Sequence, residues 1–152
     1  MYIQLLHCTF QDELYFGTLS PALYSLDLRS LVPKYHGERL GTCQAMTSIG
    51  QVLVMGDLES SSIVLWNLTQ TFQTKKVFLQ DSRLQWISSL WVHGKYLWIA
   101  HNNFHLFASY KTENVTFGIH RVELPQEILQ QNSGNSIEPI LILLAVVSAL
   151  CH

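Results

Sequence analysis

The chain has 152 residues, of which 48% are apolar and 13% are charged, and its formal net charge is −2. This composition excludes a disordered polypeptide and suits one domain with a hydrophobic core. The basic residues are too few and too scattered to neutralise a run of phosphates, so nucleic acid is not an expected partner.

Short runs rich in β-branched and aromatic residues follow one another along the chain, and such runs predict strands. No stretch before residue 125 shows the 3.6-residue period of an amphipathic helix. The runs fall into three units of four, at 2–8, 13–19, 22–28 and a weaker 35–41; at 43–49, 51–57, 62–68 and 73–79; and at 86–92, 95–101, 104–110 and 116–123.

A tight turn and a small residue recur at equivalent places in each unit. A tight turn separates the first two runs, and a small residue ends the second run, where it would let the neighbouring unit approach closely. The turns are predicted at Gln11-Asp12, Gly50 and Gly94, and the small residues are Gly17, Gly56 and Ala100.

The units repeat with a period of about forty residues. Leu26, Trp66 and Phe107 take equivalent places, at intervals of 40 and 41 residues. A period in this range, carried by short strands, is typical of propeller blades. The predicted fold is therefore all-β: a partial β-propeller of about three four-stranded antiparallel blades over residues 1–124, with Leu26, Trp66, Trp98 and Phe107 at blade-core positions.

The composition changes after residue 124. Residues 125–136 are rich in Gln and Asn and are interpreted as a polar linker. Residues 137–152 form an apolar tail whose uninterrupted run, Pro139–Cys151, is shorter than the roughly twenty residues of a membrane-spanning helix. Three interpretations of this tail stay open: a membrane anchor, a buried element or an aberrant terminus.

Three widely spaced cysteines, Cys8, Cys43 and Cys151, suggest buried thiols in a reducing compartment. The first residues, Met1–His7, have no basic region, and their apolar run is too short for a secretory signal. A cytoplasmic location is the expectation.

The segment Ile63-Val-Leu-Trp-Asn-Leu68 resembles the closing box of a WD-repeat blade, in which Trp-Asp ends the third strand. Leu23–Leu28 keeps the acid of that box, and Phe104–Ser109 keeps an aromatic residue. The run Leu97-Trp-Ile-Ala100 is similar to blades in the C-terminal propellers of ROCO-type leucine-rich-repeat kinases and Rho guanine-nucleotide exchange factors. The resemblance implies a scaffolding role in a signalling complex.

Three blades cannot close a ring, because propellers have four to eight. The chain is therefore expected to be part of a larger propeller, a truncated product, or a half that self-associates through its open blade edges. Two copies would supply six blades.

No catalytic or metal-binding pattern stands out. His101 and His105 have the spacing of helical metal ligands, but they fall in a strand–turn–strand segment with no third ligand. No nucleophile elbow or glycine-rich phosphate loop is present. Trp86, Trp91 and Trp98 are interpreted as packing between blades, with an aromatic binding hot spot as the alternative. The chain is predicted to be no enzyme and to need no cofactor or metal.

The predicted function is a non-catalytic protein-interaction scaffold, a fragment of a larger signalling protein, with partners that the sequence does not identify. The alternative is a membrane-tethered interaction protein that uses the apolar tail. Loops at one end of a propeller carry its specificity. The candidate protein-binding residues there are Ser20, Pro21, Asp57, Glu59, Ser60, His101, Asn102 and Asn103.

Overall fold

The computed structural model shows a nearly all-β chain built from three antiparallel sheets. It describes residues 6–17, 21–39, 41, 45–104, 106 and 116–132. Each sheet is a meander in which consecutive strands are neighbours. The first sheet contains β1 (Leu6–Phe10), β2 (Glu13–Gly17), β3 (Ala22–Asp27) and β4 (Pro33–Glu38).

The second sheet contains β5 (Met46–Ile49), β6 (Val52–Asp57), β7 (Ser62–Asn67) and β8 (Lys76–Gln80), with the short 3-10 helix η1 (Phe72–Thr74) before β8. The third contains β9 (Trp86–His93), β10 (Tyr96–Asn102) and β11 (Phe117–Glu123), and helix α2 (Gln126–Asn132) follows it.

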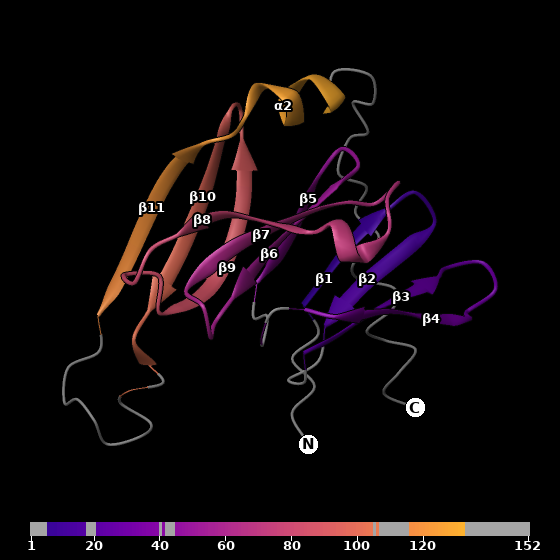
Figure 1. The fold of residues 1–152 in the computed structure, drawn as a ribbon, viewed down its shortest axis with the longest axis horizontal. Coiled ribbons are helices and arrows are strands. Elements are labelled where there is room, and N and C mark those ends of the chain that lie inside the picture. Colours follow the sequence, from indigo (N-terminus) through magenta and orange to yellow (C-terminus); the bar gives the residue numbers. More distant parts are fainter. Residues whose placement is uncertain are drawn as a thin grey trace, which may run out of the picture.

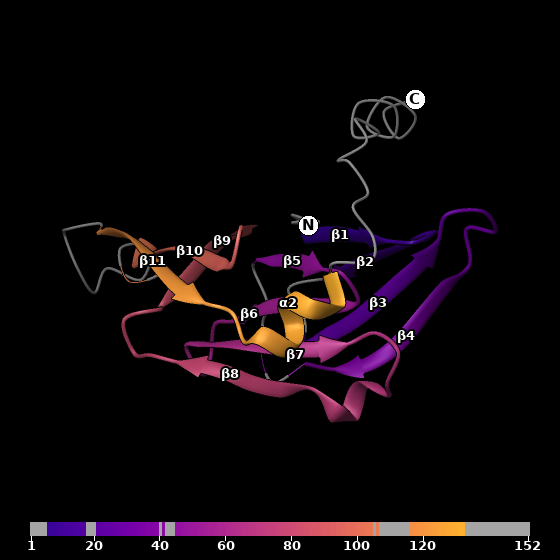
Figure 2. The same cartoon turned by 90° about the horizontal axis from the view of Figure 1, so that it is seen from above.

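The three sheets stand side by side, with the second between the first and the third (Figure 1). Their first strands are neighbours, because β1 contacts β5 and β5 contacts β9. The last strands, β4, β8 and β11, form the opposite edges. Figure 2 shows the same succession of sheets from above. Inner first strands and outer last strands are the arrangement of propeller blades, so the fold is a partial β-propeller, as predicted.

The predicted tight turns occur where the sequence placed them. Gly50 and Gly94 adopt the left-handed conformation, with φ of 53° and 58°. In the first turn this conformation belongs to Gln11, with φ of 55°. A side-chain-bearing residue is uncommon there, so the first turn carries a strain that the two glycine turns avoid.

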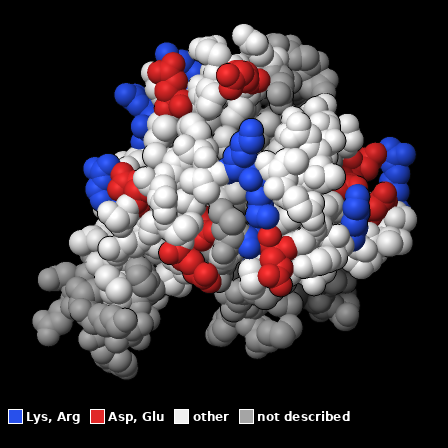
Figure 3. Space-filling view, in the orientation of Figure 1, with Lys and Arg blue, Asp and Glu red and all other residues white. Residues whose placement is uncertain are grey.

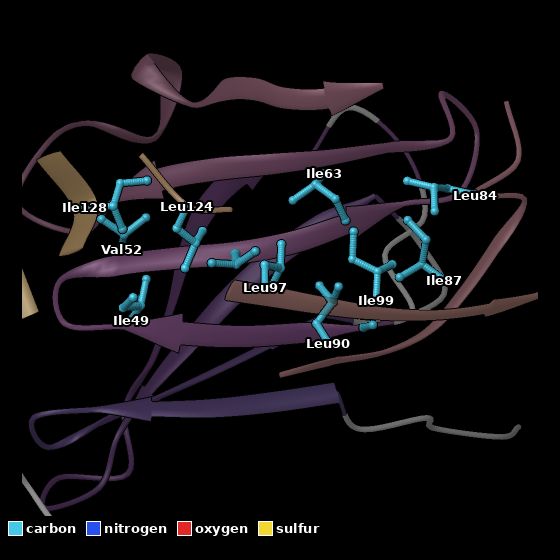
Figure 4. Close-up of a cluster of buried hydrophobic side chains, with 12 residues drawn as sticks. Ile49, Val52, Ile63, Leu84, Ile87, Leu90, Leu97, Ile99, Leu124 and Ile128 are labelled. Atoms are coloured by element: carbon cyan, nitrogen blue, oxygen red, sulfur yellow. The ribbon is translucent and has the colours of Figure 1, made fainter. Parts of the chain in front are cut away.

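Aliphatic side chains fill the space between the second and third sheets. Ile63 of the second sheet meets Leu97 and Ile99 of the third (Figure 4). Val54 belongs to the same cluster, and all four are buried. Burying such a side chain contributes about 1.5–3 kcal/mol. This cluster is the main core of the described chain.

The first and second sheets meet through a different set of side chains. Tyr15 and Leu23 of the first sheet contact Leu53, Met55 and Trp66 of the second. Phe72 of η1 joins them from the loop before β8. Aromatic and sulfur-containing residues thus replace the aliphatic ones of the other interface.

The third sheet departs from the predicted strand order. The run 104–110 was expected to pair with β10, but Phe104 and Leu106 are helical, and 107–110 lie outside the described residues. β11 pairs with β10 instead, so the described third sheet has three strands. Asn102 explains the stop, because its side-chain Oδ1 accepts a hydrogen bond from the Phe104 amide at 2.9 Å and turns the chain.

The segment expected to be a polar linker contains helix α2. The Pro125 carbonyl accepts hydrogen bonds from the amides of Ile128 and Leu129, which begin the helix. Ile128 is buried in the main core, and Leu129 packs beside it. Two apolar residues thus anchor a segment whose other residues are mostly polar. The tail at 137–152 lies outside the described residues.

Among the residues that the structure describes, no helix has the length and apolar character needed to cross a membrane.

The predicted small residues do sit at close approaches between elements. A Cβ built on Gly56 would lie 2.8 Å from Cγ2 of Ile87 in the third sheet, and one on Gly17 would overlap the Arg39 guanidinium. The space over these two glycines is therefore filled by side chains of other elements, whereas the sequence had suggested that a neighbouring backbone comes close.

Candidate functional site

A cleft of about 420 Å³ opens between the first and second sheets. It lies at the end of the sheets that carries the β1–β2 and β5–β6 turns, since Gln11 and Gln51 both line it. Its size is within the range of ligand pockets. The cleft is the best candidate for a binding site in the described part of the chain.

The floor of the cleft is a cluster of rings centred on Trp66. Its ring centroid lies 6.0 Å from that of Tyr15 and 4.9 Å from that of Phe72, both edge-on, and 5.1 Å from that of His36. Edge-on aromatic pairs contribute about 0.5–1.5 kcal/mol beyond area burial. The indole Nε1 donates to the Gln70 carbonyl at 3.2 Å, which fixes the β7–β8 loop against the rings. The floor is therefore rigid.

The walls of the cleft are polar. Glu13 and Lys34 supply one negative and one positive charge, and amide and hydroxyl side chains continue the lining. Tyr35, an exposed residue of β4, also lines the cleft. A rigid apolar floor under walls of mixed polarity suits a ligand with both apolar and hydrogen-bonding groups.

His36 connects the floor to the first sheet. Its Nε2 lies 2.8 Å from the hydroxyl Oγ of Ser25, which is 1% exposed. Burial lowers the pKa of His36, and the nearby Lys34 lowers it further, while Glu13 acts in the opposite direction. The imidazole is therefore neutral at neutral pH.

The Ser25–His36 pair does not form a catalytic nucleophile. Ser25 is buried and is not among the residues that line the cleft. In the described part of the chain, His36 makes no hydrogen bond to a carboxylate that would orient it as a base. The pair supports the ring cluster instead.

The predicted binding loops lie at the opposite end of the sheets from the cleft. They follow β2, β6 and β10, which run in the same direction in their sheets, so the described parts of these loops share one end. Pro21 and Glu59 are exposed there. Ser20 lies outside the described residues.

The other predicted loop residues have structural contacts. Asp57 is only 3% exposed, and its Oδ1 accepts hydrogen bonds from the amides of Glu59 at 2.9 Å and Ser60 at 3.1 Å. Asn103 Oδ1 accepts from the Thr116 amide at 2.7 Å. Such side-chain to backbone bonds shape turns. The binding role of these loops stays a prediction.

His101 meets His120 across β10 and β11. The two ring centroids are 4.8 Å apart, and burial followed by the His120 charge lowers the pKa of His101. His105, its suggested partner in a metal site, lies outside the described residues. No group of three metal-binding side chains occurs in the part of the chain that the structure describes.

The predicted blade-core positions differ in their surroundings. Trp66 is buried at the centre of the ring cluster. Leu26 and Trp98 are half-buried on outward faces of the first and third sheets, and Phe107 lies outside the described residues. Trp98 stacks on Trp91, with centroids 5.9 Å apart and planes within 8°. The two tryptophans therefore lie on the outward face of the described third sheet, and their packing between blades stays a prediction.

Sequence reasoning had singled out Trp66 but missed the cleft and the other three rings of its floor. Tyr15, His36 and Phe72 come from separate parts of the chain, and only sheet packing brings them together.

Charged side chains form small separate groups on the face shown in Figure 3, with a short basic column at the centre. Most of this face is uncharged, so the described surface offers no broad electrostatic patch here.

The sheets and the cleft define the class of the protein: a partial β-propeller with a pocket between two blades. Residues 11–133 match the model of the major royal jelly protein family. The chain belongs to that family. No curated protein matches its sequence.

Solved structures share the fold at low identity. The computationally designed Ika4 protein is similar with a TM-score of 0.52 and 7% identity, over 78% of this chain and 64% of that one. The tricorn protease is similar with a TM-score of 0.50 and 16% identity, over 74% of this chain and 11% of that one. These likenesses show the fold alone. The chain spans less than two thirds of either structure.

The β-propeller domain of Cps50 (Swd1) from Myceliophteria thermophila aligns with a TM-score of 0.49 and 11% identity, over 86% of this chain and 42% of that one.

Proposed function

We propose that the chain is a non-catalytic protein-interaction module that holds a short peptide segment of its partner in the cleft between the first and second sheets. The observation that carries the proposal is the rigid ring floor under polar walls, in a pocket of about 420 Å³. Aromatic floors of this kind anchor peptide side chains. The walls offer donors and acceptors for a peptide backbone.

The proposal extends to the setting of the module. A role as a scaffold within a larger signalling protein is supported by the WD-like segment at Ile63–Leu68. The resemblance of Leu97–Ala100 to blades of ROCO-type kinase and Rho exchange-factor propellers supports the same role. We also propose a cytoplasmic location, which the three widely spaced cysteines favour.

The experiment is selection of binders from a phage-displayed random peptide library on the full chain, followed by fluorescence anisotropy with the selected peptides. Glu13→Lys reverses a charge in the cleft wall, and we expect it to weaken binding about tenfold or more. Glu59→Lys is the matched control, because it makes the same charge change at the opposite end of the sheets.

Loss of binding in Glu13→Lys alone supports the cleft. Loss in Glu59→Lys alone would place binding on the predicted loops and overturn the cleft proposal. A library that yields no peptide of measurable affinity would overturn the peptide-binding function itself.

A further inference from the structure

Each sheet has two different faces, and the chain shows twice how they pack. Val54 on β6 occupies the place that Tyr15 occupies on β2, counted from the small residues Gly56 and Gly17. Tyr15 packs on the second sheet, and Val54 packs on the third. We call the face toward the following sheet the forward face, and the face toward the preceding sheet the backward face. Trp98 takes the same place on β10, two residues before Ala100, and it faces outward from the third sheet.

The backward faces show the same equivalence. Leu53 and Met55 of the second sheet receive the first sheet, and Leu97 and Ile99 of the third sheet receive the second. The equivalent residues of the first sheet are Leu14 and Phe16, which no sheet covers in the described chain.

The two end faces are apolar and aromatic. On the third sheet, Trp98 stacks on Trp91, which is 38% exposed, and Ile119 on the same face is 65% exposed. On the first sheet, Phe16 stacks on Tyr24 at 5.7 Å, and Tyr24 lies 5.4 Å from Tyr35. Stacked rings across neighbouring strands make each face preformed.

Charges on the two faces have opposite sign. The Arg121 guanidinium lies over the rings of Tyr96 at 4.6 Å and Trp98 at 5.7 Å on the third sheet. Glu123 on that face is paired with Lys95 at 2.8 Å, which leaves Arg121 as the face's net charge. Glu38 is exposed on β4, beside the strand that carries Tyr24.

We propose that the open face of the third sheet binds the open face of the first sheet in a second copy of this chain. Two such contacts related by a two-fold axis close a ring of six sheets, within the range of known propellers. Each new contact repeats the forward-to-backward packing already present twice in the chain. The occupant is thus this protein itself, joined through sheet faces, where the sequence had suggested blade edges.

Sedimentation equilibrium of the full chain tests the proposal. We expect a dimer, with twice the 17.4 kDa mass of the chain. Phe16→Asp and Trp98→Asp each place a charge on one face, and each should raise the dimer dissociation constant about tenfold or more. Val77→Asp is the matched control: it changes an exposed apolar residue on β8, away from both end faces, and should leave the dimer intact.

Mixing the two variants separates face-to-face closure from other modes of association. Phe16→Asp retains an intact third-sheet face, and Trp98→Asp retains an intact first-sheet face, so the mixture can form one complete contact. A mixed dimer that neither variant forms alone would support the proposal. Neither residue belongs to the two buried clusters, so circular dichroism should show that both variants stay folded.

Three outcomes would overturn the proposal: a wild-type chain that sediments as a monomer, a dimer indifferent to both face variants, or a mixture as monomeric as its components. The proposal is independent of the cleft, because Glu13→Lys tests peptide binding without altering either end face.

Discussion

The two interfaces between sheets differ in chemistry although the strand topology around them is the same. Between the second and third sheets, aliphatic side chains such as Ile63, Leu97 and Ile99 interlock and are completely buried. Between the first and second sheets, Tyr15, Trp66 and a neutral histidine form the contact, and an open cleft remains.

The difference shows that one repeat can form two kinds of interface between sheets, one closed and one with a cleft. Aliphatic residues fill space without needing polar partners, so they can close an interface completely. Rings with polar edges need hydrogen-bond partners, such as the Gln70 carbonyl for Trp66 and the Ser25 hydroxyl for His36. The first of these brings the polar β7–β8 loop to the interface. The first interface therefore keeps a cleft with polar walls, and the second is closed by an aliphatic core.

The largest expected effect is at the aliphatic interface. Leu97→Ala should lower the free energy of unfolding by about 2–5 kcal/mol, because it leaves a cavity among fully buried neighbours. Urea denaturation checks this. Val77→Ala, a truncation at an exposed position, should cost no more than about 0.5 kcal/mol. Equal costs at the two positions would contradict the assignment of the main core.

The next effect tests how closely the second and third sheets approach. Gly56→Ala should cost about 1–3 kcal/mol, since the new Cβ would lie 2.8 Å from Cγ2 of Ile87. A double-mutant cycle with Ile87→Ala relieves the nearest contact, because the alanine removes Cγ2 and Cδ1 and leaves only Cβ, at 3.0 Å. The prediction is wrong if Gly56→Ala costs as much in the Ile87→Ala background as in the wild type.

The repeat itself was predictable, because turns and small residues act locally. Gly50, Gly94 and Gly56 each fix the backbone or spacing of a unit by their own chemistry, so the sheets could be placed from sequence. The order of strands after β10 was not predictable, because the hydrogen bond from Phe104 to the Asn102 side chain competes with a strand pattern that looks regular.

The cleft lay beyond sequence reasoning for a related reason. Its floor combines residues from β2, β4, β7 and η1, which are far apart in the chain and become neighbours only when the sheets pack. The same holds for α2: Ile128 and Leu129 are two apolar residues in a mostly polar segment, and they are buried only because they pack on the main core. Burial that depends on two sheets leaves little trace in either segment alone.

The smallest expected effect is a pH dependence that originates in the aromatic interface. Burial holds the pKa of His36 below the ordinary value of 6.5. As the pH falls below about 6.5, the unfolded chain takes up a proton that the folded chain resists. The free energy of unfolding therefore decreases from pH 6.5 down to the folded pKa, and above pH 6.5 this histidine makes no difference. His101, whose pKa is also lowered by burial, acts in the same direction.

Replacing His36 with glutamine separates its share from that of His101. In His36→Gln, the loss of unfolding free energy between pH 7.5 and 5.5 should be smaller than in the wild type but still present, because His101 continues to titrate. A slope equal to that of the wild type in His36→Gln would mean that the ring cluster admits water to His36. The two interfaces would then differ more in their access to water than the burial of the rings indicates.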